Sequence, residues 1–134
     1  MSLENVELVR RAYAAVSRGD REGIRALLPA EFVADFSRRH MDGFALSRDD
    51  AIAMFFAQNE EVWDGLPTWE PEELIDGADT VVALIRVVAR GKIGGVEIET
   101  LVWNVWSFED GKPVRLTYFG EDRTGAMEAA GVPN

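Results

Sequence analysis

The chain has 134 residues, no cysteine, a single histidine and a formal net charge of −10. This length fits one domain, 1–134, which can bury a core without disulfides. The negative charge argues against nucleic acid and anionic membranes as partners, because both attract basic surfaces. No apolar run is long enough to span a membrane, and the first residues lack the pattern of a signal peptide. We therefore expect a soluble, cytoplasmic protein.

The first half of the chain is mainly helical by pattern. Apolar residues recur at the helical period over 3–18, and Asp20 is typical of the N-cap of a second, short helix. Residues 31–37 alternate between apolar and polar as a strand does. Ser47 then resembles the first residue of a capping box and opens a third helix over 48–63.

The second half is β by pattern. Strands over 69–75 and 80–90 are followed by a hairpin over 96–121, whose tight turn lies at Asp110 and Gly111. A short C-terminal helix closes the chain. Consecutive strands with short turns make an antiparallel meander, and helices gathered before it must cover one of its faces. The fold class predicted is therefore α+β.

The other face of this sheet is predicted to be apolar and to lack a covering helix. Its side chains, read from the alternation along each strand, are Ile85, Val87, Leu101, Trp103, Val105, Leu116 and Tyr118. A large uncovered apolar face marks an interaction site, and an identical chain is the simplest partner. The sequence therefore predicts a homodimer through the sheet.

Two polar side chains interrupt the apolar pattern of the long strands. Asn104 shares a strand face with Val102 and Trp106. There it either donates to a ligand oxygen, or is a buried amide bonded to a neighbouring strand or to Arg86. An unpaired buried Arg86 would be costly, so it either pairs with an internal acid or faces a wet cavity that binds an anionic ligand.

Two long segments resemble the SnoaL-like branch of the NTF2-like superfamily. They are ENVELVRRAYAAVSRGD at the start and VWSFEDGKPVRLTYFGEDRTGAMEAAG at the end. The resemblance implies a cystatin-like order and a curved antiparallel sheet wrapped around N-terminal helices, which forms a cone with a deep pocket. Many members of this family also dimerise through the sheet. The family includes ketosteroid isomerases, polyketide cyclases, limonene epoxide hydrolases and non-catalytic binders, so the fold alone does not give the chemistry.

Within such a cone, side chains from several segments are expected to line a pocket for a small hydrophobic ligand. They are Tyr13, Phe32, Phe36, Phe55, Gln58, Trp63, Arg86, Asn104, Trp106 and Thr117. Aromatic walls with few polar groups are typical of a pocket for an apolar molecule, and equally of a filled core. The interpretation invokes no metal and no cofactor.

The ketosteroid isomerase pattern is not retained. It uses a Tyr and a protonated Asp to bind an oxyanion, and a carboxylate as the base. Counting along the sequence places these three roles on Ala12, Asn104 and Phe36. Tyr13 and Asp35 are the neighbours of two of these positions, and Asp35 is expected on the opposite side of its strand.

The epoxide hydrolase pattern also fails. Arg86 matches it, but Val88 and Thr117 stand where the two acids are expected, so no carboxylate would activate water. A cyclase-type acid or base would have to come from His40 or Asp42, in the loop that precedes the third helix. His40 is either this acid or base, or an exposed surface side chain.

Two functions therefore stay open. In the first, the protein binds a small hydrophobic molecule. Its enzymatic version uses Asn104 and Arg86 to polarise an oxygen, while His40, Asp35 or Asp42 moves the proton. In the second, the chain is a non-catalytic dimeric module whose cone is filled with aromatic side chains.

Overall fold

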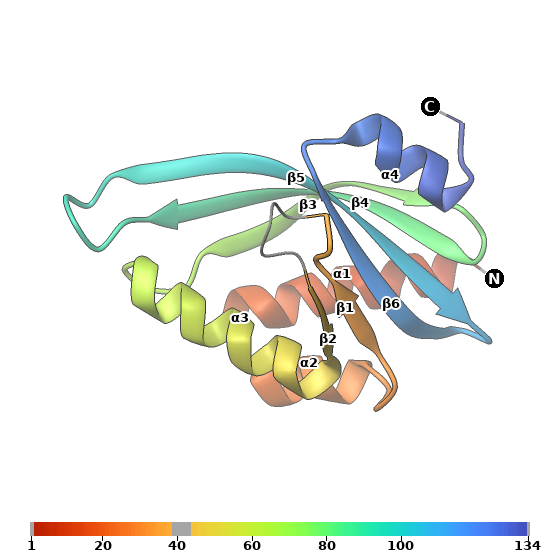
Figure 1. Ribbon diagram of the computed structural model, residues 1–134, viewed down its shortest axis with the longest axis horizontal. Coiled ribbons are helices and arrows are strands. Elements are labelled where there is room, and N and C mark those ends of the chain that lie inside the picture. Colours follow the sequence, from red (N-terminus) through yellow and green to blue (C-terminus); the bar gives the residue numbers. More distant parts are fainter. Residues whose placement is uncertain (1, 39–43, 134) are drawn as a thin grey trace.

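The computed structural model describes residues 2–38 and 44–133. These residues form four helices and a mixed six-stranded sheet of order β2-β1-β6-β5-β4-β3, which is not closed into a barrel. Three helices lie on one side of the sheet and the last helix lies on the other (Figure 1). The predicted α+β class is confirmed. The elements are α1 (Ser2–Arg18), α2 (Arg21–Leu27), β1 (Val33–Asp35), β2 (Ala45–Ser47), α3 (Arg48–Val62), β3 (Thr68–Asp76), β4 (Thr80–Arg90), β5 (Glu97–Glu109), β6 (Lys112–Gly120) and α4 (Arg123–Ala130).

The strands from β3 to β6 form the expected antiparallel meander. The hairpin turn is also as expected, because Glu109 pairs with Lys112 around a two-residue loop. Asp110 and Gly111 have φ of 52° and 77°. Positive φ at both central residues is typical of the type I′ turn, whose twist matches that of the flanking strands.

The start of the sheet differs from the sequence prediction. The strand expected over 31–37 is shorter, Val33–Asp35, and it pairs parallel with β6. A further short strand, Ala45–Ser47, pairs antiparallel with it and was not expected. Three-residue strands carry too little alternation to be recognised, and a parallel pairing across the whole chain leaves no local signal.

Side-chain caps fix where three helices begin. The carboxylates of Asp20 and Asp122 accept hydrogen bonds from the amides three residues on, which start α2 and α4. The Ser47 hydroxyl accepts one from the Asp50 amide at the start of α3. Each cap satisfies an amide that the helix itself leaves without an acceptor.

The outer face of the sheet is not as the sequence predicted. Ile85 belongs to the main core on the inner face, and Val87, Leu116 and Tyr118 pack against that core. The reason is the register, since Ile85 is opposite Val102 and paired residues share a face. The assignment of these four side chains to the outer face was therefore wrong.

A helix also covers part of the outer face. Trp103 and Val105 do lie there, but they are buried in a second cluster with Ala126 and Met127 of α4. The expectation that no helix is left to cover this face was wrong, because the C-terminal helix folds back over it (Figure 1). In the part of the chain that the structure describes, no helix is long and apolar enough to cross a membrane.

Candidate ligand cavity

A cavity of about 670 Å³ lies on the inner side of the sheet, between the strands and the first three helices. Its walls are mostly aromatic and aliphatic side chains. Most of the predicted pocket residues line it, namely Tyr13, Phe32, Phe36, Phe55, Gln58, Trp63, Asn104 and Trp106. Volumes of this size and walls of this kind are usual for small-molecule sites.

The polar centre of the cavity is the Tyr13 hydroxyl. Asn104 donates a hydrogen bond from Nδ2 to this oxygen over 2.8 Å, and Trp106 donates one from Nε1 over 3.0 Å. All three side chains are buried. The rings of Tyr13 and Trp106 meet edge to face, with centroids 5.7 Å apart. Helix α1 and strand β5 thus hold one phenol in a fixed position.

These contacts determine the protonation of Tyr13 and the direction of its hydroxyl proton. Burial raises the pKa of Tyr13 to about 12, which the hydrogen bonds from Trp106 and Asn104 only partly oppose. A phenol oxygen offers two lone pairs and one proton, and here both lone pairs are occupied. No acceptor for the proton lies among the described residues, so the O–H group remains available to the cavity that Tyr13 lines.

Asn104 therefore has a partner that the sequence did not suggest. Its amide bonds to a helix side chain, neither to a neighbouring strand nor to Arg86. Counting along the sequence paired its position with Ala12, but the structure brings Tyr13 to it instead. Ala12 lines the cavity as well, but its methyl group cannot form this hydrogen bond, and the hydroxyl comes from Tyr13 one position further on. A count along the sequence does not show which of two neighbouring helix residues reaches a distant strand.

Arg86 and Thr117 do not line the cavity. Arg86 lies opposite Leu101 on the outer face, where its guanidinium pairs with the carboxylates of Glu70 (2.8 Å), Glu72 (2.7 Å) and Glu99 (3.5 Å). Glu70 in particular raises the pKa of Arg86. The interpretation of Arg86 as a cavity cation is therefore corrected: it is an ion-paired residue on the opposite face of the sheet.

Asp35 is likewise held away from the cavity. Its carboxylate accepts hydrogen bonds from Arg115 (2.6 Å) and from the Ser37 amide (2.9 Å). Partial burial opposes ionisation, yet the bonds from Ser37 and Arg115 hold the pKa of Asp35 at about 2. His40 and Asp42, the other proposed acid–base residues, lie outside the described residues.

The sequence reading missed several lining residues. Trp69, Val102, Leu116 and Tyr118 all line the cavity, and the last two had been assigned to the outer face. The Trp69 indole nitrogen is buried and has no acceptor among the described residues. The register of β4 on β5 would have identified the inward positions, but the sequence does not give that register.

Comparisons with known proteins agree with this architecture. The model of a SnoaL-like domain family matches residues 9–116. Among curated protein sequences, none matches the chain. The fold is similar to that of an NTF2-like protein from Burkholderia thailandensis E264, with a TM-score of 0.73, 26% identity and coverage of 96% of this chain and 97% of that one.

Two further solved structures share the fold. Bal32a, from a soil-derived mobile gene cassette, has a TM-score of 0.75 and 21% identity, with 90% of this chain and 92% of that chain covered. TerC, co-crystallised with polyporic acid, has a TM-score of 0.72 and 22% identity, with 95% and 97% covered. At these identities the likeness concerns the fold alone.

Proposed function

Since the chain belongs to the SnoaL-like domain family, we propose that it binds a small, largely apolar molecule whose oxygen accepts a hydrogen bond from the Tyr13 hydroxyl. The observation that carries the proposal is the Tyr13 O–H group, which has two donors on its oxygen and no acceptor for its proton among the described residues. In a mostly apolar cavity, a donor of this kind favours a carbonyl or similar oxygen in the ligand.

Binding is favoured over acid–base catalysis. Of the described residues that line the cavity, Glu61 alone has a carboxylate, and it is exposed on α3. Phe36 lines the cavity where the isomerase pattern has its base. The described lining residues can therefore polarise a ligand oxygen, but they offer no buried base to remove a proton from its carbon skeleton.

Two observations support ligand binding over a filled core. The cavity of about 670 Å³ has room for a bicyclic or tricyclic molecule. The fold relative TerC was crystallised with polyporic acid. The sheet dimer stays a prediction, and its apolar surface is now smaller because α4 covers Trp103 and Val105.

A matched pair of probes tests the proposal. Fluorenone and fluorene have nearly the same shape, but only fluorenone carries a carbonyl. We expect the protein to bind fluorenone roughly three- to tenfold more tightly than fluorene, because one hydrogen bond to a neutral acceptor contributes about this much affinity. Quenching of tryptophan fluorescence gives both dissociation constants.

Two variants assign the difference to one hydroxyl. Tyr13→Phe should remove the preference for fluorenone, while Tyr118→Phe, which alters the other tyrosine of the cavity wall, should keep it. Thermal denaturation checks that both variants fold. Equal affinities of the wild-type protein for the two probes, or an unchanged preference in Tyr13→Phe, would contradict the proposal.

A further inference from the structure

Strand β5 extends well beyond its neighbour β6. The two strands pair only from Trp103 to Glu109, whereas β4 pairs with β5 from Glu97 to Ser107. Among the residues that the structure describes, no strand pairs with the other side of residues 97–102. They therefore form an open edge, in the part of the β4–β5 ribbon that extends beyond the end of β6 (Figure 1).

Every second residue along this edge turns its backbone N–H and C=O groups away from β4. The amide of Phe108 donates to Asp79 and that of Gly91 donates to the carbonyl of Val96. In an antiparallel ladder these directions alternate, so the even-numbered residues of β5 face β4. The N–H and C=O groups of Glu97, Glu99 and Leu101 consequently point outward from the edge.

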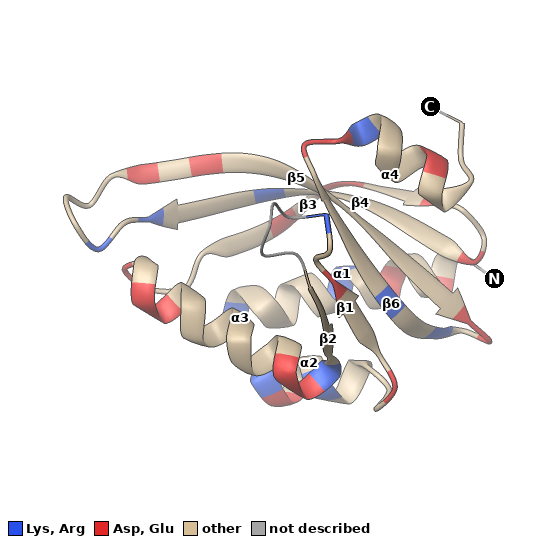
Figure 2. Ribbon diagram, in the orientation of Figure 1, with Lys and Arg blue, Asp and Glu red and all other residues tan. Residues whose placement is uncertain are grey.

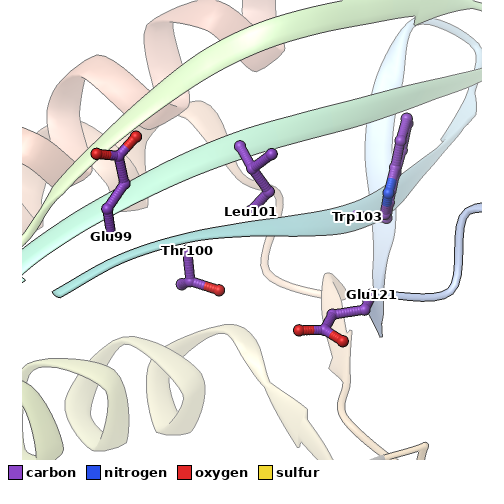
Figure 3. Close-up of a pocket in the computed structure, with 5 residues that line it drawn as sticks. All are labelled: Glu99, Thr100, Leu101, Trp103 and Glu121. Atoms are coloured by element: carbon purple, nitrogen blue, oxygen red, sulfur yellow. The ribbon is translucent and has the colours of Figure 1, made fainter.

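A hollow of about 500 Å³ lies beside this edge. Its walls are Glu99, Thr100, Leu101, Trp103 and Glu121 (Figure 3). Gly120, with φ of 57°, turns the chain away at the end of β6 and leaves the space open. Figure 3 shows Glu99, Leu101 and Trp103 on one side of β5, with Thr100 and the Glu121 carboxylate on the other.

The edge of β5 lacks the protection that the other long edge has. Strand β3 contains Pro71, and its register shifts between Pro71 and Glu73, two devices that prevent the addition of another strand. No proline and no register shift against β4 occur over 97–102. The side chains of Ile98 and Leu101 are 46% and 47% exposed.

The charges around the edge are mostly negative. Glu97, Glu99 and Glu121 lie along it, against Arg86 and Arg90 on β4, and the acidic bands on β5 are visible in Figure 2. Arg86 pairs with Glu70, Glu72 and Glu99, and Arg90 pairs with Glu97 over 3.8 Å. With Glu121, the carboxylates at this edge still outnumber the two guanidinium groups. A second copy of this chain would bring the same acidic edge and a net charge of −10, so the surface favours a basic partner.

We propose that residues 97–102 of β5 bind an extended, Lys- or Arg-containing peptide segment as an added strand. Its backbone would pair with Glu97, Glu99 and Leu101, and its basic side chains would lie near Glu97, Glu99 and Glu121. Its apolar side chains would cover Ile98 or Leu101. Thr100 and Val102 of this segment also line the cavity, but the proposed pairing uses the backbone of Glu97, Glu99 and Leu101 and does not depend on the proposed ligand.

The probe for this surface is the blocked peptide Lys-Val-Thr-Val-Lys-Val-Thr-Val with a fluorescent label. Fluorescence anisotropy should show saturable binding that weakens as the salt concentration rises. The same peptide with Glu for Lys should not bind. Nor should a version N-methylated at alternate residues, because it cannot donate to the edge. Binding of either control peptide as tightly as the probe would overturn the proposal.

Variants of Leu101 locate the site. Leu101→Pro removes an outward N–H that β4 does not use, and it should weaken binding about tenfold, whereas Leu101→Ala keeps this donor and should retain most of the affinity. Circular dichroism checks that both fold. Unchanged binding by a folded Leu101→Pro overturns the proposal. Light scattering gives a further test. If the wild-type protein and Leu101→Ala have the mass of a dimer and Leu101→Pro has the mass of a monomer, a second copy is the occupant and the proposal is overturned.

Discussion

The Tyr13 hydroxyl links three buried side chains that lie far apart in the sequence. Asn104 and Trp106 come from one strand, and their two donors converge on a single oxygen of α1. Neither donor has another acceptor among the described residues, so each depends on that oxygen. A hydroxyl with both lone pairs occupied has its proton direction fixed before a ligand arrives, which lowers the entropic cost of binding.

The raised pKa of Tyr13 predicts a specific dependence of stability on pH. In the unfolded chain the phenol ionises near pH 10, but in the folded protein it keeps its proton until about pH 12. Between these values the unfolded state binds fewer protons, so the free energy of unfolding should fall as pH rises, by about 2 kcal/mol. Below pH 10 the stabilising contribution of the protonated Tyr13 phenol is present in full.

This dependence can be measured in the Tyr118→Phe background, because the chain has only two tyrosines. Phenolate absorbance should then appear only as the pH approaches 12, or when the protein unfolds. Adding Tyr13→Phe should remove the corresponding loss of stability between pH 10 and 12. An ionisation of the folded protein at pH 10 would show that the hydroxyl is solvated.

At the scale of strands, alternation predicts which residues share a face but not which face is inward. It correctly separated Asn104 and Trp106 from Trp103 and Val105 on β5. On β4, Val82 and Leu84 are as apolar as Ile85 and Val87, so the choice of face depends on pairing with β5. The glycine-rich turn between these strands has no sequence signature that fixes the register, and the prediction for Arg86 failed for this reason.

Adjacent residues of β5 offer a test of the cavity. Val102 lines the cavity, whereas Leu101 lies on the outer face and is 47% exposed. Val102→Phe should fill part of the cavity and weaken fluorenone binding at least about tenfold, with less than about 1 kcal/mol lost in stability because the ring enters open volume. Leu101→Phe, the same kind of change one residue away, should leave the affinity unchanged. Fluorescence titration and urea denaturation give the two quantities, and equal affinities in both variants would place the probe elsewhere.

At the scale of the whole molecule, the sheet separates two apolar clusters of unequal size. The larger one lies between the sheet and the first three helices and surrounds the cavity, while the smaller one lies under α4. The helix periodicity, the caps and the hairpin turn were sufficient to predict most elements of this arrangement. The sequence did not show that eight residues of α4 would cover the outer face, because the position of a short helix depends on contacts with distant strands.

The smaller cluster should contribute substantially to stability even though it is remote from the cavity. Met127 on α4 is only 2% exposed and packs in the cluster with Trp103 and Val105. Met127→Ala should lower the free energy of unfolding by about 2–5 kcal/mol, because it removes a buried side chain and leaves a void. Glu128→Ala, at the exposed neighbouring position, should change it by less than about 0.5 kcal/mol. Urea denaturation measures both variants, and light scattering shows whether a loosened α4 exposes enough of the outer face for chains to associate. Equal, small effects of the two substitutions would mean that α4 does not hold this face of the sheet closed in solution.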